Sequence, residues 1–189
     1  MNKPRPVPFA DRSLVEAELD RIEKQGILTQ VDVVEFTTTP LVVVPKSNGT
    51  VRVCGDFIVS VNPHLNVQQY PMPWCEEVFQ KLTGGKRFTK LDLAEAYLQL
   101  EMDKASHRYL VFTTHEGLYR INRLAFGQAC APAIFQSVIE QVLASIPRTQ
   151  PYLDDIVVTG ATPDEHFTSL SLCLNRMREV GIRLRREKR

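Results

Sequence analysis

Two aspartates stand side by side inside an apolar segment of the chain. Tyr152-Leu153 precede Asp154 and Asp155, and the apolar run Ile156–Val158 follows them. Adjacent carboxylates repel each other and resist burial unless a cation compensates their charge. The pair therefore indicates either a cation-binding site or a tight turn, where aspartate is a common residue.

A third aspartate, Asp92, lies between Leu91 and Leu93, 62 residues before Asp154 (154 − 92). If the two segments pair as neighbouring strands, three carboxylates come together. Oxygen ligands without an accompanying His or Cys suit Mg²⁺ or Mn²⁺ better than zinc. Two such ions about 3.5–4 Å apart can activate a 3′-hydroxyl and stabilise a leaving pyrophosphate. That is the chemistry of nucleotidyl transfer.

The elements that must position these residues follow an α+β pattern with antiparallel sheets. A capping box at Ser13–Glu16 and a stop at Gly26 predict a helix near 12–25. Two β-branched runs around Ser47–Thr50 predict a hairpin. The further expected elements are a strand at 88–93 with a short helical segment at 94–98, a hairpin at 110–123, a helix at 131–143, a hairpin around 152–158, and a helix opened by the capping box Thr162–Glu165 and closed by Gly181.

Composition sets wider bounds on the class of protein. The chain has 189 residues, 43% of them hydrophobic and 24% charged, as in a globular protein. Its net charge of +1 combines a local +5 over residues 176–189 with −4 before them, so the total does not indicate a nucleic-acid binder. The four cysteines form no C-x-x-C pair, which argues against a zinc site or a disulfide framework. No signal peptide or transmembrane stretch is visible, so we expect an intracellular protein of the cytoplasm or nucleus.

Three ordered motifs carry a family resemblance that covers nearly the whole chain. They are Phe88-Thr-Lys-Leu-Asp-Leu-Ala-Glu-Ala-Tyr97, then Arg123-Leu-Ala-Phe-Gly127 with Ala131-Pro-Ala-Ile-Phe-Gln136, and Tyr152-Leu-Asp-Asp155. Together they resemble the reverse transcriptase domain of gypsy-type long-terminal-repeat retrotransposons, which are related to retroviral reverse transcriptases. The resemblance implies an RNA-directed DNA polymerase that transfers deoxynucleotides from dNTPs to a primer 3′-end on an RNA or DNA template.

The resemblance also assigns roles to residues. Asp92, Asp154 and Asp155 match the catalytic, metal-binding set, with two Mg²⁺ ions as cofactors and Mn²⁺ as a substitute. The family's dNTP-binding positions fall on Lys46, Arg52, Tyr97, Phe126 and Gly127, with Tyr97 excluding the ribose 2′-hydroxyl. Primer and template contacts fall on Tyr152, Asp56, Phe57 and Asn62. The sequence departs from many relatives at Ala125, where they have proline, and at Ile58, where they have a basic residue.

The implied fold is the fingers and palm of a right-hand polymerase, the palm being a ferredoxin-like antiparallel sheet backed by helices. We expect fingers at 1–66 and 100–130, and palm at 67–99 and 131–189. A primer-gripping hairpin, a thumb and a ribonuclease H domain follow the palm in the family, and we expect them to be absent here.

Two other classes of function stay open at this point. One is a catalytically incompetent retroelement remnant or a domesticated nucleic-acid-binding fragment, which the expected lack of a thumb favours. The other is a metal-dependent nuclease built on the same carboxylates. A nuclease would leave Lys46, Arg52 and Tyr97 unexplained.

Overall fold

The computed structural model describes residues 5–47, 49–66 and 70–185, and its chain divides into two compact units. Unit 1 comprises Met1–Val67 and Leu100–Ala131, and unit 2 comprises Gln68–Gln99 and Pro132–Arg189. The chain thus enters each unit twice. None of the helices in the described ranges is long and apolar enough to cross a membrane.

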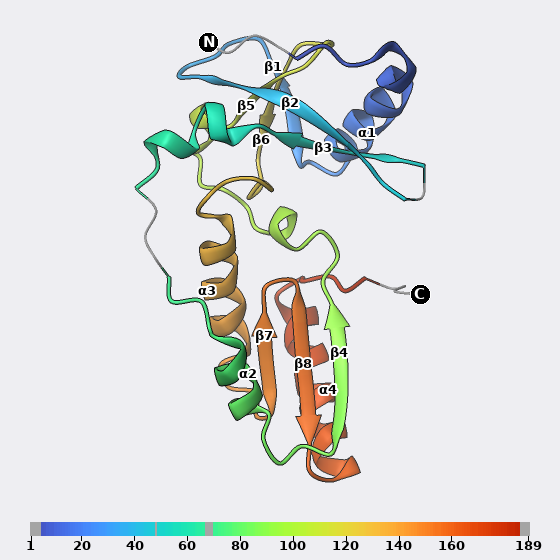
Figure 1. Ribbon diagram of the computed structural model, residues 1–189, viewed down its shortest axis with the longest axis vertical. Coiled ribbons are helices and arrows are strands. Elements are labelled where there is room, and N and C mark those ends of the chain that lie inside the picture. The colour runs from blue at the N-terminus through green and yellow to red at the C-terminus, as the bar shows by residue number, and fades with distance from the viewer. Residues whose placement is uncertain (1–4, 48, 67–69, 186–189) are drawn as a thin grey trace. The chain divides into compact units, whose positions relative to one another are not determined.

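Unit 1 is built on a five-stranded sheet of order β1-β6-β5-β2-β3 (Figure 1). Its strands are β1 (Leu28–Val31), β2 (Thr38–Pro45), β3 (Val51–Gly55), β5 (Val111–Thr113) and β6 (Leu118–Ile121). Both predicted hairpins form, as β2–β3 and β5–β6. The expectation of purely antiparallel sheets is wrong here, because β2 pairs with β5 in parallel. A parallel pair needs a long connection, and the chain between β2 and β5 passes through unit 2.

Helix α1 (Arg12–Lys24) covers this sheet with the buried side chains Val15, Leu19 and Ile22. It packs against β1 and β3. The helix is one residue shorter than the predicted range 12–25 and ends before Gly26, whose φ of +70° suits glycine. Its predicted capping box does not form: the N-cap is Asp11, with no side-chain cap bond, because a 3-10 turn over Phe9–Asp11 runs directly into the helix.

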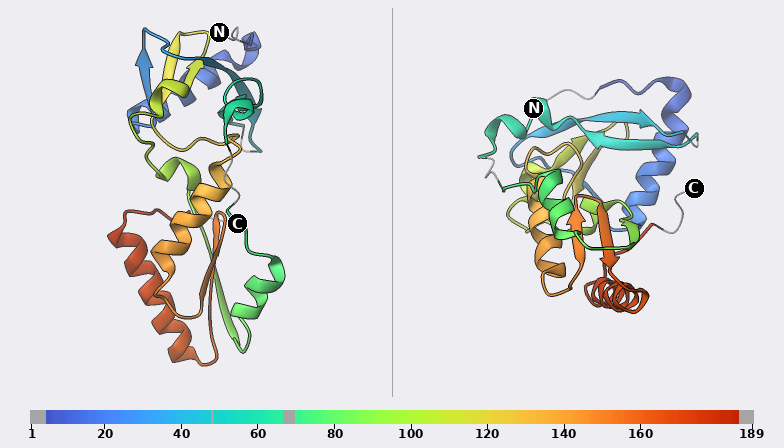
Figure 2. Two further views of the ribbon diagram at one scale, coloured as in Figure 1. Left: turned by 90° about the vertical axis from the view of Figure 1, so that its left-hand side faces the viewer. Right: turned by 60° about the horizontal axis from the view of Figure 1, so that its bottom comes forward.

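Unit 2 is built on a three-stranded antiparallel sheet of order β4-β8-β7. Its strands are β4 (Arg87–Asp92), β7 (Thr149–Tyr152) and β8 (Asp155–Gly160), and its helices are α2 (Cys75–Lys81), α3 (Ala131–Leu143, whose first residue belongs to unit 1) and α4 (Pro163–Glu179). Helix α4 packs across one face of the sheet, mainly on β8, and α2 lies on the opposite side, against β7 (Figure 2). The predicted sheet backed by helices is therefore confirmed.

Apolar side chains between α4 and the sheet form the core of unit 2. Ile156 and Val158 of β8 and Cys173 and Met177 of α4 are all buried. The hydroxyl of Thr162 accepts a hydrogen bond from the Glu165 amide at 3.2 Å, as the predicted cap requires. This packing fixes β8, and β8 carries one of the candidate aspartates at its first residue.

Candidate active site

Asp92 and Asp155 face each other across two neighbouring strands. Asp92 is the last residue of β4, Asp155 is the first of β8, and the antiparallel register pairs them directly. Residues directly opposite in an antiparallel pair project their side chains from the same face of the sheet, and like charges there are destabilising. The sequence hypothesis that the two aspartate segments pair as neighbouring strands is confirmed, and the structure adds the register that makes Asp92 and Asp155 direct partners.

Asp154 lies in the turn between β7 and β8. Its backbone is hydrogen-bonded to the residue that follows Asp92. The Leu93 amide donates to the Asp154 carbonyl at 2.8 Å, and the Asp154 side chain is exposed. Leu153 has a φ of +52°, a conformation that L side chains rarely adopt. Such a backbone persists only where its surroundings enforce it.

Gln136 enforces this turn, and sequence reasoning assigned it no role. Its side chain is fully buried, accepts a hydrogen bond from the Leu153 amide at 2.8 Å and donates to the Pro151 carbonyl at 3.1 Å. It also donates to Glu140 at 2.7 Å. A glutamine beside the apolar face of α3, next to Phe135, was the available signal, because a buried amide needs partners.

Two cations lie against the facing carboxylates. Lys90 Nζ is 2.6 Å from Asp155 Oδ2, and Arg185 Nη1 is 3.3 Å from Asp92 Oδ1. The Asp92 side chain is only 7% exposed. Burying carboxylates in opposing positions requires positive charge, and here two protein cations supply it. Sequence reasoning assigned a role to neither cation.

The three candidate ligands suit a hard divalent ion, because all of them are carboxylates. Two protein cations already lie against two of these carboxylates. In the described part of the chain, however, the three carboxylates do not meet within 4.8 Å of one another. Binding of one ion by all three therefore requires their side chains to turn.

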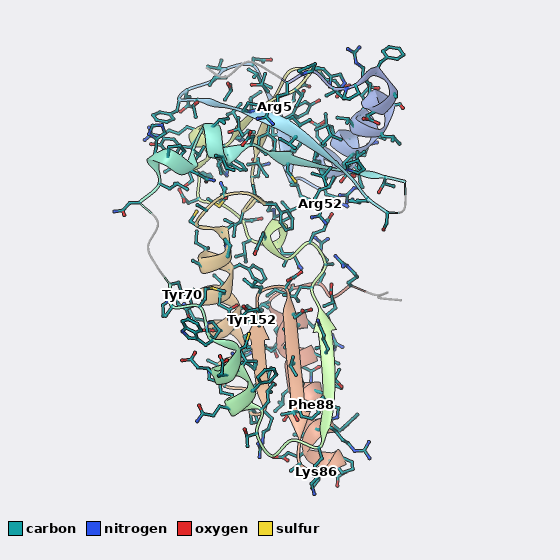
Figure 3. The ribbon with its side chains drawn as sticks, in the orientation of Figure 1. Arg5, Arg52, Tyr70, Lys86, Phe88 and Tyr152 are labelled. Carbon is teal, nitrogen blue, oxygen red and sulfur yellow. The ribbon has the colours of Figure 1, made fainter. Side chains whose placement is uncertain are left out.

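Two predicted tyrosines lie beside these carboxylates in unit 2. Tyr152 ends β7 and is paired with Asp155 (Figure 3). Tyr97 lies in the 3-10 helix Ala96–Gln99, with its ring edge-on to Phe135 at 5.4 Å between centroids. Burial, followed by the negative charge of Asp154, raises the pKa of the Tyr97 hydroxyl. That hydroxyl therefore stays protonated at neutral pH.

The predicted dNTP-binding cations lie in unit 1, on the β2–β3 hairpin. Lys46 follows β2, and its Nζ is 3.7 Å from Glu18 of α1. Arg52 is in β3, with its guanidinium 5.2 Å from the centre of the Phe126 ring (Figure 3 labels Arg52). Asn48, which the sequence predicts to be part of the turn between these strands, lies outside the described residues.

Gly127 and Asn62 form one local structure in unit 1. The Asn62 side chain donates to the Gly127 carbonyl at 2.9 Å and accepts from the Ala129 amide at 3.0 Å. Gly127 has a φ of +92°, and a Cβ there would lie 3.2 Å from the Gly55 carbonyl oxygen. Both features require glycine. Asn62 therefore holds the loop that carries Phe126.

The predicted template residues Asp56 and Phe57 have different surroundings. Asp56 forms an ion pair with Arg5. Phe57 is fully buried, 5.7 Å from the Phe112 ring centroid. Its ring is thus part of the core of unit 1, and a nucleic acid could contact this segment only through its backbone or its neighbours.

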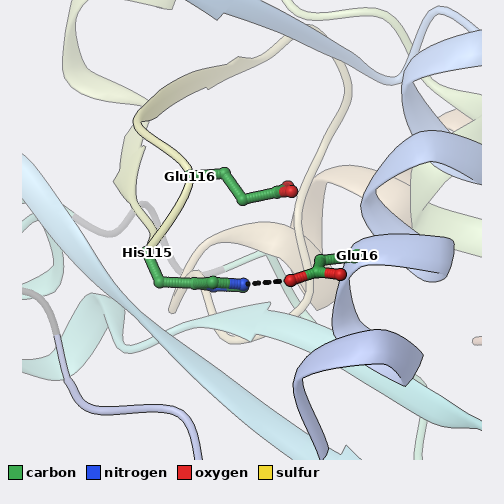
Figure 4. Close-up of side chains that lie close together, drawn as sticks. All are labelled: Glu16, His115 and Glu116. Atoms are coloured by element: carbon green, nitrogen blue, oxygen red, sulfur yellow. Dashed lines mark hydrogen bonds and ion pairs between the residues drawn. The ribbon is translucent and has the colours of Figure 1, made fainter.

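A separate set of ligand-type residues lies in unit 1. Glu16, His115 and Glu116 offer ligand atoms within 4.8 Å of one another, and His115 Nε2 is 3.2 Å from Glu16 Oε1 (Figure 4). This contact joins the β5–β6 turn to α1. The set includes none of the predicted metal ligands.

A model of the reverse transcriptase (RNA-dependent DNA polymerase) family matches residues 11–189. The chain therefore belongs to that family. It is 32% identical over 185 residues to the uncharacterized protein K02A2.6 of Caenorhabditis elegans, covering 97% of this chain and 14% of that protein. It is 27% identical over 179 residues to the Transposon Tf2-3 polyprotein of Schizosaccharomyces pombe, covering 94% of this chain and 13% of that polyprotein.

Solved structures of similar fold include the native prototype foamy virus protease-reverse transcriptase. It matches with a TM-score of 0.87 and 26% identity, over 97% of this chain and 24% of that chain. The foamy viral protease-reverse transcriptase solved with an RNA/DNA hybrid matches with a TM-score of 0.86 and 23% identity, over 97% and 24% of the two chains. The fold is thus that of the fingers and palm of retroviral reverse transcriptases. The chain spans about a seventh of the curated relatives and a quarter of these viral chains.

Proposed function

We propose that unit 1 is the fingers and unit 2 the palm of an RNA-directed DNA polymerase that adds deoxynucleotides to a primer 3′-end. The observation that carries the proposal is the direct pairing of Asp92 with Asp155, with Asp154 in the adjoining turn. Family membership supports the polymerase reading over a nuclease.

In this proposal Asp92, Asp154 and Asp155 hold divalent ions, two Mg²⁺ or Mn²⁺. Reverse transcriptases generally use divalent metal ions, and when bound these would activate the primer hydroxyl and stabilise the pyrophosphate leaving group. The protein's own contribution is to present three carboxylates from rigid strand ends and from a turn held by Gln136. Rigid placement matters because small displacements of reacting groups are costly in rate.

The remaining predicted residues bind substrate in this proposal. Lys46 supplies a point charge and Arg52 a bidentate fork, which suit triphosphate oxygens. Tyr97 and Phe126 contact the incoming sugar, with Gly127 allowing close backbone approach. Tyr152, Asp56 and Asn62, with the backbone of Phe57, contact primer and template. The foamy viral relative was solved with an RNA/DNA hybrid, which is consistent with such partners.

Primer extension on a polyribonucleotide template with Mg²⁺ or Mn²⁺ tests the proposal. We expect incorporation that Asp154→Asn abolishes and Asp164→Asn preserves, since Asp164 is an exposed carboxylate in the first turn of α4. Incorporation that persists in Asp92→Asn would contradict the site. Nucleic-acid binding without incorporation, in the presence of either ion, would favour the non-catalytic binding fragment.

A further inference from the structure

The segment after α4 lies along the end of β4 and is joined to it by an isolated β-bridge and backbone hydrogen bonds. Gly181, with a φ of +74°, ends the helix, and Leu184 then forms an antiparallel bridge with Leu93. The Arg185 amide donates to the Asp92 carbonyl at 2.8 Å, and the Ala94 amide donates to the Arg183 carbonyl at 3.0 Å. Backbone bonds therefore place Arg185 beside Asp92.

Gln99 anchors the same segment from the other side. Its side-chain oxygen accepts from the Arg183 amide at 2.6 Å, and its side-chain nitrogen donates to the Arg183 carbonyl at 3.0 Å. Because Arg183 is held through its backbone, its exposed side chain takes no part in this anchoring. The position of Arg185 is consequently built into the fold of unit 2.

The Arg185 side chain meets a carboxylate that is otherwise enclosed. Its guanidinium lies 3.3 Å from Asp92 Oδ1, and Asp92 is 7% exposed while Arg185 is 43% exposed. The guanidinium carries a positive charge that is delocalised over its planar group. A divalent ion bound at about 2.1 Å from the Asp92 carboxylate would lie within a few ångströms of this cation. The two positive charges would repel each other.

We propose that Arg185 is a built-in counter-ion of Asp92: it neutralises the carboxylate in the metal-free protein and weakens its affinity for a divalent ion. This proposal rests on the proposed metal site. It assigns to Arg185 a positioning and affinity-setting role, which nothing in the motifs of the sequence indicates. The partial exposure of the guanidinium lets it move towards solvent when an ion binds.

Direct titration with Mn²⁺, followed by the electron paramagnetic resonance signal of the free ion, tests this without any need for catalysis. Arg185→Gln removes the charge near Asp92 and should lower the Mn²⁺ dissociation constant by roughly tenfold or more, because a unit charge a few ångströms from a divalent ion repels it appreciably even when water screens the interaction. Arg183→Gln removes the same charge from the same segment. It should leave the dissociation constant within about twofold, because its side chain does not contact Asp92.

Two further variants separate the explanations. Arg185→Lys keeps the charge, so its dissociation constant should stay near that of the unchanged chain even if Arg185→Gln folds poorly. A purely structural role would make both Arg185 variants bind Mn²⁺ more weakly. Equal affinities for Arg185→Gln and Arg183→Gln would overturn the counter-ion role while leaving the metal site intact. Mn²⁺ binding unaffected by Asp92→Asn would instead contradict the metal site itself, and with it this proposal.

Discussion

Asp92 and Asp155 occupy directly opposed positions at the ends of β4 and β8, and each has a cation of its own, Arg185 and Lys90. Opposed like charges destabilise a sheet. The site is therefore assembled at a cost to the fold, and the two protein cations offset part of that cost.

Replacing Lys90 should destabilise the metal-free protein. We expect Lys90→Gln to lower the free energy of unfolding in EDTA by about 0.5 kcal/mol, a small value because the lysine side chain is 57% exposed. Urea denaturation measures this, and the difference should shrink at high salt. Arg87→Gln, an exposed residue of the same strand, is the matched control and should change the stability less. An equal loss in the two variants would show that Lys90 acts only through net charge.

Replacing Gln136 should disturb the turn that carries Asp154. Gln136→Leu keeps the bulk but removes the partners of the Leu153 amide and Pro151 carbonyl, which should cost about 1–3 kcal/mol for buried groups left unsatisfied. Thermal unfolding measures this. Gln141→Leu, on the exposed side of the same helix, should cost less than about 0.5 kcal/mol. Similar losses in both would refute the role of Gln136 in the turn.

Alanine at Gly127 should be worse than alanine at Gly26. Both glycines have positive φ, but a Cβ at Gly26 meets nothing within 4 Å, whereas one at Gly127 lies 3.2 Å from the Gly55 carbonyl oxygen. We expect a loss of about 1 kcal/mol for Gly26→Ala and about 2–3 kcal/mol for Gly127→Ala, measured by denaturant unfolding. Equal losses of unfolding free energy in the two variants would mean that the loop around Gly127 moves to accommodate the Cβ at no cost in stability.

Stability should fall at alkaline pH through Cys173. Burial raises the pKa of its thiol from 9.0 to about 11, so the folded state keeps a proton that the unfolded state releases. The stabilisation is complete below pH 9 and is lost as the pH rises to about 11, a change of roughly 2–3 kcal/mol. Unfolding measured between these pH values should show a shallower decline in Cys173→Ala. The opposite slope would contradict the burial argument.

Thiol labelling gives an independent check on the same residue. Cys75 is exposed and should react with a thiol reagent in the folded protein, whereas Cys173 should react only after unfolding. Rapid labelling of Cys173 under native conditions would indicate that α4 detaches from the sheet.

Most helices and strands could be predicted from sequence because their signals are local. Helix α3 has the predicted bounds, α4 begins at its predicted cap, α1 ends before its predicted glycine, and the hairpins lie near their predicted ranges. Among the α-helices and strands, the missed elements are β1, whose four residues form a strand only by pairing with β6, and α2, a seven-residue helix with no buried side chain. Neither carries an apolar pattern strong enough to be recognised alone.

The sequence by itself determined which residues are candidates for catalysis. They are three aspartates within apolar segments, and ordered motifs surround them. Charge in an apolar segment is visible without coordinates, because it contradicts the local preference for burial. The tertiary structure alone decided that Asp92 faces Asp155, that Gln136 holds the turn and that Phe57 is core. It alone brought Arg185 to Asp92, since contacts between residues 93 positions apart (185 − 92) depend on strand register and helix ends that no local signal encodes.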